Sequence, residues 1–204
     1  DPPAAACLKF LLATGVRRSE AVGATWAEFD FARDEWHIPA TRTKNALPYI
    51  VPLSGLALDL LDDMAEWTAG AWRGAGGKAE RPICTTDAVF PGAAGEALTG
   101  YAVSQAMKRA LPRMELEGGR ATPHDLRRTL VTVMNEQLDI EPHHVEAVVN
   151  HVSGTARAGV AGVYNRAQYL RQKRAALDAW SAWLLDVVEG RRQPDNVVTL
   201  HVTA

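Results

Sequence analysis

The segment at residues 121–130, ATPHDLRRTL, constrains the fold more than any other stretch because it specifies where an amphipathic helix begins. Thr122 suits the N-cap position, Pro123 suits the first helical position, and an aspartate follows three residues after the cap. Apolar residues then recur at helical spacing, which predicts a helix with one face in the core: Leu126, Leu130, Val133 and Met134.

The same segment contains a candidate phosphate site. At about 100° per residue, His124 and Arg127 lie within about 60° of each other on the side away from Leu126. A helix N-terminus carries partial positive charge and favours anions. A His-Asp-x-Arg helix start is nevertheless more often an ordinary capped helix end at the surface. The rest of the sequence must distinguish that interpretation from a phosphate site.

Composition sets broad limits on the fold and on the partners. The 204 residues are 47% hydrophobic and 23% charged, which is ordinary for one soluble globular domain, and no membrane span or signal peptide is apparent. Two cysteines are too few for a disulfide framework and fit a reducing cytoplasm. The net charge of −2 argues against nonspecific coating of nucleic acid, although a local arginine cluster could still bind phosphates.

Periodicity and capping residues predict a mainly α-helical fold with a small antiparallel sheet. Helices are expected over residues 3–14, 16–22, 54–67 (capped by Ser54, with Trp67 on its apolar stripe), 99–111, 122–134 and 142–150. A long amphipathic helix is expected last, with Leu177, Trp180, Leu184 and Val187 on one face. Two runs of β-forming residues, 34–39 and 47–53, predict a hairpin with Lys44 at its tip, to which residues 88–90 add a short strand.

Four separated segments carry residues suited to phosphate chemistry. Arg17 opens the second helix and is spaced to pair with Glu20, three residues later. His151 follows the helix over residues 142–150, and the small-residue stretch 153–162 leads to Tyr164. An ordinary surface ion pair and a solvated hairpin lysine are the alternative interpretations of Arg17 and Lys44.

Together these segments resemble the tyrosine recombinase, or phage integrase, family, and most closely its satellite-phage and genomic-island branch. Residues 14–20, TGVRRSE, are similar to the first arginine box, and residues 124–129, HDLRRT, to the His-x-x-Arg box. Residues 150–154, NHVSG, followed by 158–166, AGVAGVYNR, resemble the box that contains the second histidine and the nucleophile. The order and spacing agree over essentially the whole chain.

The resemblance implies the catalytic core of an enzyme that breaks and rejoins DNA through a 3′-phosphotyrosyl intermediate, for site-specific integration or excision of a mobile element. Arg17, Arg127 and His151 would hold the scissile phosphate, and Tyr164 would attack it. Lys44 would act as general acid and His124 would assist proton transfer. Neither a nucleotide cofactor nor a metal is implied.

Three positions leave questions open within this resemblance. Asn150 stands where many family members have glycine, which a backbone turn tolerates. Arg42 could reach the space assigned to Lys44. Tyr169, five residues after Tyr164, is a second candidate nucleophile, but we expect it within the last helix.

The implied organisation is a catalytic domain over residues 1–190 and a tail over residues 191–204 that packs on its own sheet or on a neighbouring protomer. The upstream domain that clamps the other face of DNA is not in this sequence, which begins DPP without a methionine. The implied partners are double-stranded attachment-site DNA, a homotetramer on that DNA and accessory DNA-bending or directionality proteins. The implied location is the bacterial cytoplasm, at the nucleoid, with no membrane partner.

Three other classes of protein compete with this interpretation. A metal hydrolase could use His143, His144 and His151 as ligands, although no recognised metal motif is present. A simple DNA-binding regulator would explain the helices around Gly15 but not the remaining candidate residues. A type IB topoisomerase shares the chemistry and would relax DNA without site preference.

Overall fold

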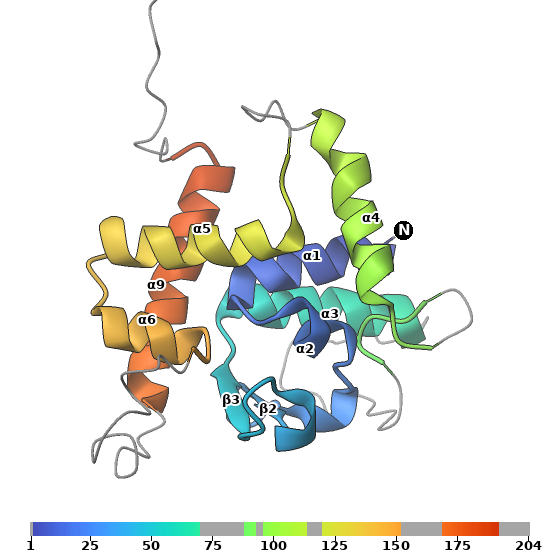
Figure 1. Cartoon of the computed structure of the whole chain (residues 1–204), viewed down its shortest axis with the longest axis horizontal. Coiled ribbons are helices and arrows are strands. Elements are labelled where there is room, and N and C mark those ends of the chain that lie inside the picture. The colour runs from blue at the N-terminus through green and yellow to red at the C-terminus, as the bar shows by residue number, and fades with distance from the viewer. Residues whose placement is uncertain (1, 70–87, 93–95, 114–119, 152–168, 192–204) are drawn as a thin grey trace, which may run out of the picture.

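Helix α1 (Pro2–Thr14) is the central element of the structure, a computed structural model that describes residues 2–69, 88–92, 96–113, 120–151 and 169–191. It packs against five other helices (Figure 1): α2 (Arg18–Val22), α3 (Gly55–Ala69), α4 (Gly100–Ala110), α5 (Pro123–Glu136) and α9 (Leu170–Val188). Its buried side chains, including Cys7 and Phe10, form the middle of the hydrophobic core. The predicted mainly helical fold is therefore confirmed.

A three-stranded antiparallel sheet lies below helices α1 and α3 in the view of Figure 1. Its strands follow the order β1 (Phe29–Asp30), β2 (Glu35–Ile38) and β3 (Tyr49–Pro52), and β2 pairs with β3 in the predicted hairpin. The ring of Trp36 stacks on that of Phe29, with 5.3 Å between the ring centres, and its centre lies 5.6 Å from that of Phe10. Aromatic packing therefore joins the sheet to α1.

The predicted strand at residues 88–90 does not join this hairpin. Ala88 forms an isolated bridge with Thr25, and β1 supplies the third strand instead. The turn between β1 and β2 explains the difference, because Asp30 Oδ1 accepts hydrogen bonds from the backbone N–H groups of Ala32 and Arg33. This local turn lets the chain reverse within a few residues.

The predicted beginnings of α4 and α5 are confirmed. Thr99 Oγ1 accepts a hydrogen bond of 3.1 Å from the N–H of Ala102 at the start of α4. At the start of α5, the N–H of Thr122 donates to Asp125 Oδ2 at 2.8 Å in a capping box, with Pro123 in the first turn. Hydrogen bonds from Thr122 lower the pKa of Asp125.

Three predictions about helix boundaries and faces were wrong. The hydroxyl of Ser54 does not cap α3: it is buried with no hydrogen-bond partner among the described residues. Trp67 lies 49% exposed near the end of α3, where the helix has passed the core. Tyr169 precedes α9 instead of lying in it, because its φ of 48° is left-handed.

Helix α9 connects the last part of the fold to the sheet. It packs against α6 (Pro142–Val148) and β3. Its Lys173 is 3% exposed, donates a hydrogen bond to the carbonyl of Ile50, and lies 4.7 Å from the centre of the Tyr49 ring. Burial lowers the pKa of Lys173 to about 8. None of the described helices is both long enough and apolar enough to span a membrane.

Candidate functional site

A cleft of about 1690 Å³ brings together five of the predicted site residues: Arg17, Lys44, His124, Arg127 and His151. Arg17 is the N-cap of α2, and Lys44 lies in the loop between β2 and β3. His124 and Arg127 lie in the first turns of α5, and His151 follows the end of α6. The predicted nucleophile, Tyr164, lies outside the described residues. Segments that are far apart in the sequence therefore place their cationic and imidazole side chains around one cleft.

Arg127 is the most buried member of this group, with 8% of its surface exposed. Its Nη1 donates to the carbonyl of Gly15 at 2.6 Å, and its Nη2 donates to the carbonyl of Val149. Gly15 has a φ of +66°, and a Cβ there would lie 2.9 Å from Leu130, so glycine is required at this turn. Burial and the neighbouring charge of Arg17 lower the pKa of Arg127 to about 10, which leaves it charged near neutral pH.

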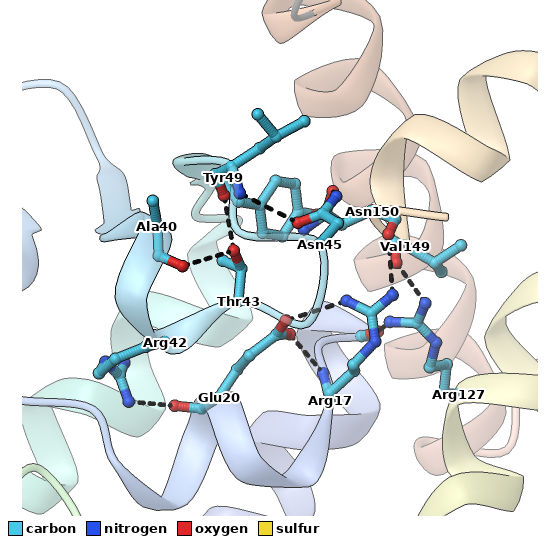
Figure 2. A network of polar contacts seen from close by, with 12 residues as sticks. Arg17, Glu20, Ala40, Arg42, Thr43, Asn45, Tyr49, Arg127, Val149 and Asn150 are labelled. Carbon is cyan, nitrogen blue, oxygen red and sulfur yellow. Dashed lines mark hydrogen bonds and ion pairs between the residues drawn. The ribbon is translucent and has the colours of Figure 1, made fainter. Parts of the chain in front are cut away.

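Arg17 is held by the buried carboxylate of Glu20, as predicted from their spacing (Figure 2). Arg17 Nη1 lies 2.9 Å from Glu20 Oε1, and the backbone N–H of Arg17 donates to Glu20 Oε2 at 2.8 Å. Arg17 Nη2 donates to the carbonyl of Asn150 at 2.8 Å. Since Glu20 is fully buried, its charge offsets both arginines in a site where unpaired charge is costly.

The C-terminal end of α6 is the common anchor of the site. Carbonyl groups at a helix end lack partners within the helix. Here three successive carbonyls accept from other elements: Val148 from the hydroxyl of Tyr49, Val149 from Arg127 and Asn150 from Arg17. Burial raises the pKa of Tyr49, so its hydroxyl remains a donor. The residue that follows, His151, is thereby fixed in position relative to the two arginines.

The other three described members of the group are exposed. His124 and Lys44 have exposed side chains at the cleft, suited to contact a ligand. His151 Nδ1 lies 3.7 Å from Glu146 Oε1, a distance too long for a hydrogen bond. Two arginines held by carbonyl groups, with exposed donors at the rim, form an arrangement that can hold a tetrahedral anion such as a phosphate.

The alternative that Arg42 replaces Lys44 loses support. Arg42 donates from Nε and Nη2 to Glu28 at 2.8 and 2.7 Å, and from Nη1 to the carbonyl of Glu20 at 3.2 Å. Its guanidinium is therefore used in holding α2 to the sheet. Lys44 lines the cleft.

Several residues at the cleft were not identified from the sequence. Additional basic side chains line it and extend its positive surface: Arg18, Lys108, Arg120 and Arg128. The net charge of −2 hides this local excess, and only the positions of Arg18 beside Arg17 and of Arg128 beside Arg127 could have indicated it. Tyr49 and Asn45 were missed because their partners lie about one hundred residues away in sequence.

The histidines proposed as metal ligands are arranged differently. His143 and His144 contact each other at 4.0 Å between ring centres, and both contact the ring of Tyr169. Within the described ranges, no group of three or more His, Cys, Asp or Glu side chains could hold a metal ion.

Comparison with known proteins identifies the family. The model of the phage integrase family matches residues 3–169. The chain is 32% identical to prophage integrase IntA of Escherichia coli K12 over 83% of this chain and 36% of that protein. It is 27% identical to prophage integrase IntZ of the same organism, over 92% of this chain and 41% of IntZ. It thus spans well under half the length of these relatives.

Solved structures agree on the fold. XerA recombinase superposes with a TM-score of 0.53 at 15% identity, covering 95% of this chain and 58% of that one. The Tn1549 transposon integrase, solved in complex with transposon right end DNA, superposes with a TM-score of 0.54 at 18% identity, covering 85% and 57%. The chain belongs to the phage integrase family of tyrosine recombinases, and its fold is that of their catalytic domain.

Proposed function

We propose that this chain is the catalytic domain of a site-specific recombinase that integrates or excises a mobile element. The observation that carries this proposal is the cleft in which Arg17, Arg127, His124, His151 and Lys44 meet. Family membership supports recombination in general. The residue types in the cleft support the finer proposal of cleavage through a covalent phosphotyrosyl intermediate.

The proposed reaction exchanges one phosphodiester bond for another. The phenol oxygen of Tyr164 attacks the scissile phosphorus, a bond from phosphorus to Tyr164 forms, and the bond to the 5′ oxygen breaks. Lys44 gives a proton to the leaving 5′ oxygen, and His124 assists removal of the phenol proton. Rejoining runs the same steps in reverse with a new 5′ hydroxyl.

The arginines would contribute by stabilising charge. Arg17 and Arg127, with His151 as a third donor, would bind the nonbridging oxygens of the phosphate and the extra charge of the transition state. Each guanidinium already donates to a carbonyl at the end of α6, so little reorganisation is needed when the phosphate binds.

Double-stranded DNA is the proposed substrate. The basic side chains along the cleft would contact its phosphates. One structural relative was solved with circular intermediate DNA, which supports the same partner for this chain. By family resemblance we further propose a homotetramer on attachment-site DNA, accessory DNA-binding proteins and action at the nucleoid.

Covalent trapping tests this proposal. The full-length gene product, with any sequence that flanks residues 1–204, is incubated with a nicked suicide DNA from the junction of its mobile element, with EDTA present. We expect a protein–DNA adduct through a 3′ phosphate. The Tyr164→Phe variant should bind the DNA but form no adduct.

The outcomes separate the competing functions. Strand cleavage that leaves no protein–DNA adduct, and that occurs only when EDTA is left out, would support a metal hydrolase. Site-specific binding without an adduct would indicate a DNA-binding regulator. Relaxation of any supercoiled plasmid, without a defined site, would indicate a topoisomerase.

A further inference from the structure

One side-chain hydrogen bond connects the two loops that carry Lys44 and His151. Asn45 Nδ2 donates to Asn150 Oδ1 at 2.9 Å (Figure 2). Asn45 directly follows Lys44 in the loop between β2 and β3, and Asn150 directly precedes His151 at the end of α6. The bond therefore sets the separation of two cleft residues that no backbone hydrogen bond joins to each other.

The loop presents the amide of Asn45 in a defined orientation. The hydroxyl of Thr43 donates to the carbonyl of Leu47 at 2.7 Å, which closes the turn (Figure 2 shows Thr43 beside Asn45). The N–H of Leu47 lies 3.4 Å from Asn45 Oδ1. Because the oxygen of Asn45 faces Leu47, its NH₂ group is left to donate, and Asn150 must present its oxygen.

Asn150 is held from its backbone as well as from its side chain. Its carbonyl accepts from Arg17 at 2.8 Å, so the residue cannot shift without moving the Arg17 guanidinium. Asn45 thus ties the Lys44 loop to a point already fixed by one of the two phosphate-binding arginines.

Asparagine at position 150 is energetically less favourable than glycine would be in this backbone conformation. Asn150 has a φ of 46°, which glycine adopts freely and asparagine tolerates. Its Nδ2 is buried without a hydrogen-bond partner among the described residues, which is unfavourable. Glycine would remove both penalties, so the bond to Asn45 is what the asparagine side chain contributes.

We propose that Asn45 and Asn150 are positioning residues that hold Lys44 beside the scissile phosphate. This proposal rests on the proposed function, because it assigns the pair to the delivery of the leaving-group proton. The asparagines do not touch the reacting atoms. They restrict the Lys44 loop so that its ammonium group meets the 5′ oxygen.

The test compares two leaving groups on otherwise identical suicide DNA, in the full-length gene product. A 5′-bridging sulfur leaves as a thiolate without protonation, so its departure does not require a general acid. Asn45→Ala, Asn150→Gly and the double variant are measured beside wild type and Lys44→Ala. Asn150→Gly keeps the backbone conformation, and thermal unfolding of each variant checks the fold.

We expect Lys44→Ala to slow cleavage of the oxygen substrate by about 100-fold and each asparagine variant by about 10-fold. The double variant should be no slower than either single one, because both remove the same bond. On the sulfur substrate all four variants should cleave within about 2-fold of wild type. DNA affinity should be unchanged in the three asparagine variants, which keep every basic side chain of the cleft.

Equal losses on both substrates would overturn the proposal, because the pair would then shape the phosphate site rather than deliver Lys44. Additive losses in the double variant would overturn it too, as would asparagine variants as fast as wild type on oxygen. Failure of wild type to cleave either substrate would instead refute the proposed function.

Discussion

The buried carboxylate of Glu20 allows two arginines to share one small site. Arg17 and Arg127 are close enough for Arg17 to lower the pKa of Arg127, and Glu20 opposes that effect. Like charges that are partly removed from water repel strongly unless an anion compensates them. Until a phosphate binds, the compensating anion in this structure is Glu20.

Replacing Glu20 should therefore cost stability. We expect Glu20→Ala to lower the free energy of unfolding by about 2 kcal/mol, because Arg17 stays partly exposed and recovers some hydration. Glu20→Gln should cost about 1 kcal/mol, since an amide oxygen can still accept from the backbone N–H of Arg17. Urea denaturation measures both values.

Glu136→Gln is the matched control for this substitution. Glu136 is exposed at the end of α5, and its replacement should change the free energy of unfolding by less than about 0.5 kcal/mol. A Glu20→Gln protein as stable as wild type would show that the carboxylate charge does not hold the arginines.

At the scale of elements, α9 and β3 form a buried contact that should respond to pH. Lys173 has its pKa lowered from 10.5 to about 8 by burial. Above pH 8 the folded protein releases a proton that the unfolded chain still binds, so stability rises with pH until the unfolded pKa is reached. We expect Lys173 to add about 2 kcal/mol to the free energy of unfolding between about pH 8 and pH 10, measured as wild type relative to a variant without this lysine. The comparison is needed because the buried Cys7 thiol and Tyr49 hydroxyl, whose pKa values are raised, lower stability over the same range.

Lys173→Met supplies the comparison for this pH dependence. Methionine fills a similar volume without a titrating group, so the contribution of about 2 kcal/mol over this pH range should be absent in the variant. Urea denaturation at several pH values measures the free energy of unfolding of both proteins and so tests this prediction. An identical slope in both proteins would show that Lys173 titrates normally in the folded state.

Local sequence signals predicted the elements well but not the contacts between them. Thr122 and Asp125 fix the start of α5 through bonds within one turn, and such short-range signals are visible in a sequence. The prediction that residues 88–90 add a strand to the hairpin was wrong because Ala88 pairs with Thr25 instead. Tertiary packing determines this pairing, and the local sequence does not show it. The partnership of Asn45 with Asn150 has no periodicity to reveal it.

The candidate site followed the same pattern. Arg17, His124, Arg127 and His151 were identified from ordered boxes, and the structure brings them into one cleft with Lys44. Their carbonyl anchors at the end of α6 could not be predicted, because any helix end leaves free carbonyls and no residue type marks their partners.

At the scale of the whole molecule, positive charge is concentrated at the cleft although the chain is slightly acidic overall. We expect Lys108→Gln and Arg120→Gln each to weaken DNA binding and to reduce the slope of log affinity against log salt by about 1, since each removes one phosphate contact. Fluorescence anisotropy at several salt concentrations measures the slope.

Arg109→Gln is the control, because Arg109 is exposed on α4 directly beside Lys108 but does not line the cleft. Its slope should equal that of wild type. If Arg109→Gln and Lys108→Gln lowered the slope equally, the DNA would have to follow a path other than the cleft.

The most direct test of the proposed cleavage reaction is to identify the residue that carries DNA in the trapped adduct. Trypsin places Tyr164 in the peptide of residues 158–166 and Tyr169 in the peptide of residues 167–171, so mass spectrometry can separate them. We expect a nucleotide joined through its 3′ phosphate to Tyr164 alone. The same modification on Tyr169 or Tyr101 would contradict it.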